Sequence, residues 1–330
     1  MNKKILSFFA IALIVVSPVF SQAAYEAQRN GAEENLNESV NVNLAVMAGP
    51  TGFGSAGLSQ NEGKIDDTLS VTTKVYSSPT EVIAQIAKGT EDVAALPSNL
   101  AAVLYNKGLK IKLAAVIGNG MLSVISSDVT DPSQLVGESI SIPGGPASTP
   151  NQLAKLLISD NGLTEDDFDL EYGVTSSAQL SQLLIAEKVK TALLPEPFVT
   201  MVLSSNKNIK KIYDAQYGYK LATGMDNYPM TVLVVQDKFA QENPEALKAF
   251  LKAYEGSTTF VVSNPEEAGT LIENMGIMNQ SMATPAIPNC NLTYVDAKDA
   301  KSEINSYYEM LFNFAPSSVG GSLPGDDFYL

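Results

Sequence analysis

The apolar residues of the chain fall into short runs whose spacing alternates between that of strands and that of helices. Runs rich in valine, isoleucine and leucine are followed by segments whose apolar residues recur every three or four positions. The predicted strands are 42–47, 69–76, 93–96, 111–117, 122–126, 140–142, 169–172, 191–194, 209–213 and 231–235. The predicted helices are 79–88, 98–106, 131–135, one beginning near Pro150, 178–187, 244–262, 265–274 and 297–312. This alternation predicts an α/β fold.

The stretch 139–151 is the most informative of the strand-to-helix connections. A short run of isoleucines enters a loop of Pro, Gly, Ala, Ser and Thr, and an amphipathic helix follows. Ser148 or Thr149 can cap that helix, and Pro150 suits its first turn. Gly144 and Gly145 allow a ligand to approach the backbone closely. The stretch is therefore either an ordinary turn of an α/β protein or a ligand-binding loop.

Other predicted strands also end in small polar residues at the start of a helix or turn. In open α/β sheets, ligands bind beyond the carboxyl ends of the strands. We therefore expect a ligand to be bound by the loops 47–54, 96–99, 118–122, 143–149, 195–198 and 224–230. The candidate ligand-binding residues are Gly49, Pro50, Thr51, Ser98, Asn99, Asn119, Gly144, Gly145, Ser148, Thr149, Glu196 and Tyr228. The Gly-rich loop after residue 47 lacks the Gly-Lys-Ser/Thr of a phosphate loop, which argues against nucleotide binding.

The order of the elements predicts two lobes with the chain crossing between them twice, near 120–127 and 226–233. Lobe 1 would comprise residues 41–123 and 230–330, and lobe 2 residues 124–229. A cleft between two such lobes is a favoured place for a ligand, and hinge motion would close it.

The N-terminus predicts export. Two lysines precede an apolar run and small residues follow it, which is the pattern of a secretory signal peptide over residues 1–23. Residues 24–40 are polar and predict a flexible leader. The one cysteine, Cys290, is too far along the chain to carry a lipid at that site, so we expect a periplasmic protein without a stable membrane anchor. Loss of two lysines with the signal would make the formal net charge of −15 more negative still, which argues against nucleic-acid binding.

The composition also excludes several kinds of catalysis. The chain contains no His, no Trp and one Arg, Arg29. A Ser-His-Asp triad, a Cys-His pair and a His-ligated metal site are therefore impossible. We expect no catalytic residues, no metal, no cofactor and no enzyme activity.

Four segments carry a resemblance to a known family. They are Asp92–Asn99, Leu135–Ile140, Pro143–Pro146 and Ala192–Pro197. With the signal peptide, their order resembles that of the periplasmic solute-binding proteins of ABC importers, in the branch that binds nitrate, taurine, alkanesulfonates and thiamine-precursor pyrimidines. The resemblance implies a type II binding-protein fold, a monomer, and delivery of a small molecule to a membrane permease and its ATPase.

The residues favour one class of ligand within that branch. The predicted ligand loops contain no Lys or Arg and two acids, Glu196 and Asp226. A neutral or cationic ring compound, such as a thiamine-precursor pyrimidine, suits this lining, and Tyr228, Phe53, Phe198 and Tyr217 are candidates to stack on it.

Each of these residues also has a purely structural interpretation. Glu196 suits the first turn of a helix, and Ser98 and Asn99 suit helix caps. An anion such as an alkanesulfonate, taurine or nitrate would have to rely on backbone N–H groups at helix starts. Two further alternatives are a biosynthetic enzyme of the same fold and a sensor or adhesion ectodomain.

Overall fold

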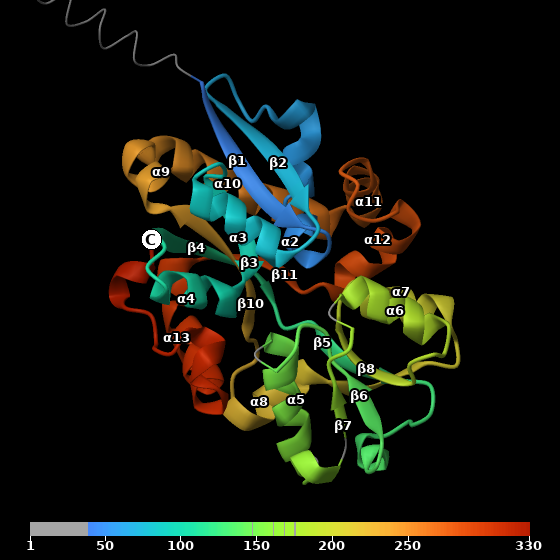
Figure 1. The fold of residues 1–330 in the computed structure, drawn as a ribbon. Coiled ribbons are helices and arrows are strands. Elements are labelled where there is room, and N and C mark those ends of the chain that lie inside the picture. The colour runs from blue at the N-terminus through green and yellow to red at the C-terminus, as the bar shows by residue number, and fades with distance from the viewer. Residues whose placement is uncertain (1–38, 147, 161, 168, 175) are drawn as a thin grey trace, which may run out of the picture. The chain divides into compact units, whose positions relative to one another are not determined.

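The computed structural model describes residues 39–330 except 147, 161, 168 and 175 (Figure 1). The predicted signal peptide and residues 24–38 of the predicted leader lie outside the described residues. The first strand begins at Val40, so the last residue assigned to the leader belongs to the sheet instead. Among the described residues, no helix is long and apolar enough to cross a membrane.

Eleven strands and twelve α-helices are described, and most match the ranges predicted from apolar spacing. The strands are β1 (Val40–Met47), β2 (Leu69–Tyr76), β3 (Val93–Pro97), β4 (Ile111–Asn119), β5 (Leu122–Ser126), β6 (Ser139–Ser141), β7 (Asp169–Glu171), β8 (Thr191–Pro195), β9 (Lys210–Asp214), β10 (Pro229–Gln236) and β11 (Leu292–Asp296). The helices are α2 (Pro50–Phe53), α3 (Pro79–Lys88), α4 (Ser98–Asn106), α5 (Thr149–Asp160), α6 (Ser177–Ile185), α7 (Phe198–Ser205), α8 (Ala215–Thr223), α9 (Asp237–Glu242), α10 (Pro244–Ser263), α11 (Pro265–Asn274), α12 (Gln280–Ala286) and α13 (Ala297–Phe314).

Local sequence explains several helix ends. The Ser78 hydroxyl accepts a hydrogen bond from the Glu81 N–H at the start of α3, and Gly89 ends the helix in the left-handed conformation. The predicted helix at 131–135 is a 3₁₀ turn, Pro132–Leu135, and a capping box between Asp131 and Gln134 begins it.

The strands form two sheets. The first has six strands in the order β11-β4-β10-β3-β1-β2, in which β1, β2, β3 and β4 point the same way and β10 and β11 run against them. The second has five strands in the order β7-β6-β8-β5-β9, in which β5 runs against the others. Strands before Gly120 and after Tyr228 belong to the first sheet, and β5 to β9 belong to the second.

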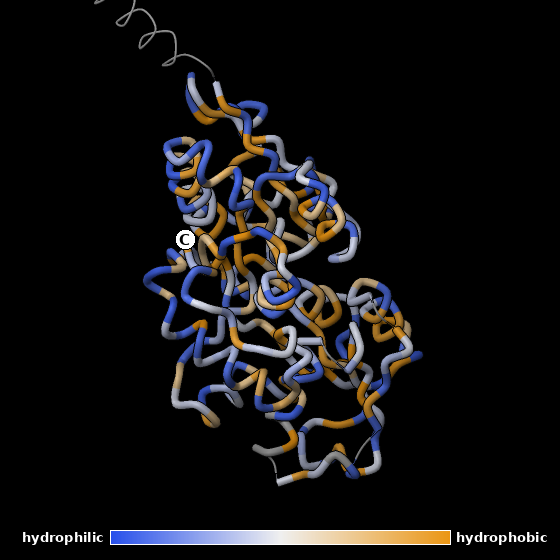
Figure 2. The backbone as a smooth tube through the Cα atoms, turned by 60° about the vertical axis from the view of Figure 1, so that its left-hand side comes forward, coloured by the Kyte–Doolittle hydropathy of each residue, from blue (hydrophilic) through white to orange (hydrophobic). Residues whose placement is uncertain are grey.

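Alternate residues of the first sheet are buried on opposite faces. Leu44, Val93 and Leu233 pack with Phe250 of α10, whereas Ala45 and Val234 pack on the other face. Helices α3 and α4 cover this second face, together with α13. Because both faces are covered, the central strands β3, β4 and β10 are mostly apolar. Figure 2 shows hydrophobic residues in orange within the body of the molecule.

The second sheet is covered in the same way, by α6 and α7 on one face and by α5 and α8 on the other. The apolar cluster beneath α5 and α8 is continuous with the cluster beneath α13, through Leu122, Tyr228 and Tyr307. One hydrophobic cluster therefore spans both sheets.

Two short crossings connect the sheets. Strand β4 leads into β5 through Gly120 and Met121 alone, and residues 224–228 lead from α8 to β10. Two residues span only about 7 Å when extended. The carboxyl end of β4 must therefore lie beside the start of β5, which is paired with the carboxyl end of β8. The strand ends of the two sheets consequently face each other.

Candidate functional site

We call the region where these strand ends meet the seam. Its first-sheet side is formed by residues 47–54, 97–99, 119–121 and 228–229, and its second-sheet side by residues 141–146, 148–149 and 195–198. The seam contains most of the loops that the sequence predicts to bind a ligand. Several of its polar side chains are buried, among them Thr51, Ser98, Asn99, Thr149 and Glu196.

Asn99 and Thr149 form a direct contact across the seam. The Thr149 hydroxyl, at the start of α5, donates to Asn99 Oδ1, at the start of α4, over 3.0 Å. The Asn99 amide nitrogen donates in turn to the carbonyl oxygen of Ser318 over 3.3 Å. Because the Ser318 carbonyl can only accept, this second bond fixes which end of the Asn99 amide faces Thr149. Both predicted residues are thus brought together.

Ser98 links three elements of the first sheet's side. Its hydroxyl donates to the Pro229 carbonyl over 2.6 Å, and its own carbonyl accepts from the Tyr308 hydroxyl over 2.8 Å. This side chain is fully buried. In the loop after β1, the Thr51 hydroxyl likewise forms its hydrogen bonds within the protein, with the backbone N–H and carbonyl of Met47. Pro50 begins α2 after Gly49, whose φ of 122° is accessible to glycine and strained for other residues.

The Gly144–Gly145 loop adopts the conformation that its glycines predict. Both residues have φ near 90°, in the left-handed region. The Ser148 hydroxyl donates to the Gly145 carbonyl over 2.7 Å and accepts from the Asn151 N–H over 3.4 Å. Ser148 therefore caps α5, which leaves the Thr149 hydroxyl available for the contact across the seam.

Tyr228 lies in a buried group of tyrosine rings. Its ring stacks on that of Tyr307 from α13 with centroids 5.5 Å apart and an angle of 25° between the planes. The ring centroids of Tyr219 of α8 and Tyr228 are 5.2 Å apart, so elements of both sheets contribute rings. Burial raises the pKa of the Tyr228 and Tyr307 hydroxyls above the ordinary value. They therefore remain protonated and can act as hydrogen-bond donors.

The side chains of the other predicted aromatic residues do not join this group of rings. Phe53 is buried in an apolar cluster with residues of α11 and α12, and Phe198 packs in the core of the second sheet. Tyr217 is 60% exposed on the surface of α8. Sequence analysis missed Tyr307, because its spacing with Ile304 and Leu311 on α13 is that of a core residue.

Glu196 lines a separate pocket at the crossing, with a volume of about 290 Å³. The pocket lies between Asn289 and Asn291 on one side and Lys211 and Asp214 on the other. Only 7% of Glu196 is exposed, and one carboxylate oxygen accepts from the Thr200 N–H over 3.0 Å. Burial raises the pKa of Glu196, while Thr200 and Lys211 act in the opposite direction. Asn119 reaches the same region through its N–H, which donates to the Asn291 carbonyl.

Lys211 changes the charge expected for this region. It lies on β9, outside the predicted loops, because β9 runs beside β5 and ends at the seam. Its ammonium group is 3.3 Å from Asp214, which offsets its charge. Asp226, the second acid of the predicted loops, pairs with Lys220 at 2.5 Å. In the part of the chain that the structure describes, no three His, Cys, Asp or Glu residues gather closely enough to hold a metal ion.

The sequence and the fold are similar to those of known proteins. A family model described as NMT1/THI5 like matches residues 66–268. Among solved structures, an ABC transporter from Parabacteroides distasonis is 26% identical, with a TM-score of 0.76, and the match covers 88% of this chain and 98% of that chain. A search of curated proteins returned no match.

Two further solved structures are similar in fold. The ligand binding component of an ABC-type import system from Staphylococcus aureus with zinc bound is 14% identical, with a TM-score of 0.68, over 88% of this chain and 96% of that one. The periplasmic aliphatic sulphonate binding protein SsuA from Escherichia coli is 11% identical, with a TM-score of 0.68, over 86% and 94% of the two chains. The two-sheet architecture is therefore that of the periplasmic binding proteins.

Proposed function

Because the chain belongs to the NMT1/THI5-like family and has the periplasmic binding-protein fold, we propose that it is the extracytoplasmic solute-binding component of an ABC importer. It captures a small organic molecule in the seam and delivers it to a membrane permease driven by an ATPase. Residues 41–123 with 230–330 and residues 124–229 act as the two lobes. The short crossings at 120–121 and 224–228 are the hinge.

The chemistry of the seam supports a neutral or cationic ring compound as the solute. The buried groups that meet there are tyrosine rings, hydroxyls and an amide, and the Glu196 carboxylate lies in the adjoining pocket. Lys211 reaches the neighbouring pocket, but Asp214 offsets its charge. An aminopyrimidine of the thiamine-precursor type matches this set, because its ring can stack on tyrosine and its amino group can donate to a carboxylate or an amide oxygen.

An alkanesulfonate or a similar anion is the second candidate. The observation in its favour is the arrangement of α4 and α5, which both begin at the seam and can present backbone N–H groups to an anion. The structural similarity to a sulphonate binding protein agrees with this candidate. The buried Glu196 carboxylate in the adjoining pocket opposes it.

Native mass spectrometry of the gently purified protein, repeated after denaturation and refolding, tests the proposal. We expect a small neutral or cationic ring compound in the first sample and none in the second. A bound alkanesulfonate would support the anion instead. Chemical turnover of the bound molecule during incubation would point to an enzyme of the same fold.

A further inference from the structure

Two tyrosine hydroxyls in the seam have no hydrogen-bond partner among the described residues. Tyr228 and Tyr307 are both fully buried, and neither hydroxyl oxygen is in hydrogen-bond geometry with a described atom. Polar groups lie near both hydroxyls without forming a hydrogen bond of good geometry: Thr149 lowers the pKa of Tyr307, and the backbone of Leu122 and Met121 lowers that of Tyr228, but burial raises both pKa values by more. The Thr149 hydroxyl donates its hydrogen bond to Asn99 Oδ1.

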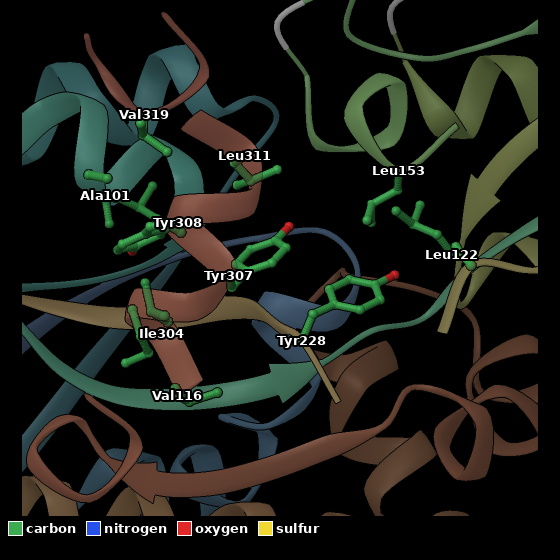
Figure 3. Close-up of a cluster of buried hydrophobic side chains, with 14 of the residues drawn as sticks. Ala101, Val116, Leu122, Leu153, Tyr228, Ile304, Tyr307, Tyr308, Leu311 and Val319 are labelled. Carbon is green, nitrogen blue, oxygen red and sulfur yellow. The ribbon is translucent and has the colours of Figure 1, made fainter. Parts of the chain in front are cut away.

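Both hydroxyls point from the first sheet's side toward the second. The rings belong to α13 and to the residue before β10, and Figure 3 shows both oxygens directed toward Leu122 of β5 and Leu153 of α5. Leu122 and Leu153 belong to the second sheet and to a helix that covers it. The two hydroxyls therefore lie where opening of the proposed hinge would expose them to water.

This arrangement has an energetic consequence. A buried hydroxyl without an acceptor loses its hydrogen bonds to water and gains none in return, which is unfavourable. Tyr308, another buried tyrosine near the seam, avoids this loss because its hydroxyl donates to the Ser98 carbonyl. Closing the seam around an acceptor held by both hydroxyls would remove the penalty.

We propose that Tyr228 and Tyr307 form a paired donor site that binds a hydrogen-bond acceptor of the solute, such as a ring nitrogen or a carbonyl oxygen. This inference rests on the proposed receptor function and deepens it. The site makes closure without solute unfavourable and closure around a suitable solute favourable. Binding of the solute is thereby coupled to closing of the hinge.

A neighbouring residue narrows the class of solute further. Gln152 is buried, and its amide nitrogen donates to the Pro146 carbonyl over 2.7 Å, which leaves its amide oxygen without a donor among the described residues. It lies one turn along α5 from Thr149, on the same side of the helix. A heteroaromatic ring that both accepts and donates, as an aminopyrimidine does, complements a seam with two free donors and a free acceptor.

Calorimetric titration of the purified protein with an aminopyrimidine bearing a hydroxymethyl group tests the donor site. Tyr307→Phe removes only the hydroxyl, so we expect its affinity to fall about threefold to tenfold relative to wild type. Its melting temperature should equal or exceed that of the wild type, because the lost hydroxyl has no partner in the closed protein. Tyr228→Phe should behave alike and serves as the second variant if Tyr307→Phe does not fold.

Tyr254→Phe is the matched control. Tyr254 is also fully buried with an unpartnered hydroxyl, but it lies on α10, on the opposite face of the first sheet. This variant should bind the aminopyrimidine with wild-type affinity. Wild-type affinity in both Tyr307→Phe and Tyr228→Phe would overturn the donor site while leaving the receptor function standing. Failure of the wild-type protein itself to bind the aminopyrimidine would overturn the donor site together with the proposed class of solute.

Discussion

Glu196 combines burial with a position at the crossing between the sheets. Only 7% of the residue is exposed, the Thr200 N–H donates to its carboxylate, and burial raises its pKa. The folded protein therefore holds the Glu196 proton more tightly than the unfolded chain does. Ionisation of the buried Glu196 carboxylate therefore destabilises the folded protein. This destabilisation is absent below pH 4.5, the ordinary pKa of the unfolded chain, and grows as the pH rises through the raised pKa of the folded state.

We accordingly expect Glu196→Gln to be more stable than the wild type at pH 7, and the difference to disappear below about pH 4.5. Urea unfolding at several pH values measures it. Glu187→Gln is the control of opposite sign, because hydrogen bonds from Asn206 and Asn208 lower the Glu187 pKa. The Glu187→Gln variant should not be more stable than the wild type at pH 7. A Glu196→Gln variant less stable than the wild type at pH 7 would contradict the assignment of burial as the dominant effect.

The sequence could predict some members of the site and not others. The pattern of apolar residues predicts that four polar residues lie where strands end and helices begin: Ser98, Asn99, Ser148 and Thr149. Tyr307 and Lys211 reach the seam only through packing: one lies in an amphipathic helix and the other in a neighbouring strand. No local signal distinguishes such residues from core or surface positions.

Among the elements, the crossing from β4 to β5 is the most tightly constrained. A Cβ atom at Gly120 would overlap the Gln216 side chain and the ring of Tyr228. Both ends of the crossing are held in strands, and the ring is fully buried, so neither side can move freely. Glycine is thus required here by close approach rather than by its backbone angles.

We expect Gly120→Ala to lower the free energy of unfolding by about 1–3 kcal/mol, because the added methyl group displaces Tyr228. It should also weaken solute binding. Gly256→Ala is the matched control: Gly256 is exposed in the middle of α10 with open space around it, and alanine there should add about 0.5–1 kcal/mol. Chemical denaturation compares the two. Equal stability of Gly120→Ala and the wild type would show that the crossing is more flexible than its contacts indicate.

Sequence periodicity predicted the apolar strands and the amphipathic helices but missed several elements. Strand β11 is an edge strand with mostly half-buried residues and an irregular register, so its alternation is weak. Helix α8 exposes Tyr217 and Leu221 on its outer face, which blurs its amphipathic pattern. The C-terminal tail, rich in Gly and Pro, forms two 3₁₀ turns and places Tyr329 beside Leu113 of β4.

In the part of the molecule that the structure describes, hydrogen bonds join the two sheets' sides at places other than the crossings. Thr149 of α5 bonds to Asn99 of α4, and Asn289, just before Cys290, donates to Thr200 of α7 over 2.9 Å. The C-terminal tail contributes through Ser318, which orients Asn99. These contacts are few and polar, which suits a seam that opens and closes.

We propose that the seam closes around one neutral or cationic ring compound. The decisive measurement is calorimetric titration of the refolded wild-type protein, with a hydroxymethyl-aminopyrimidine in one experiment and taurine in the other. We expect saturable binding of one aminopyrimidine per chain and no binding of taurine. Saturable binding of taurine with no response to the aminopyrimidine would contradict it.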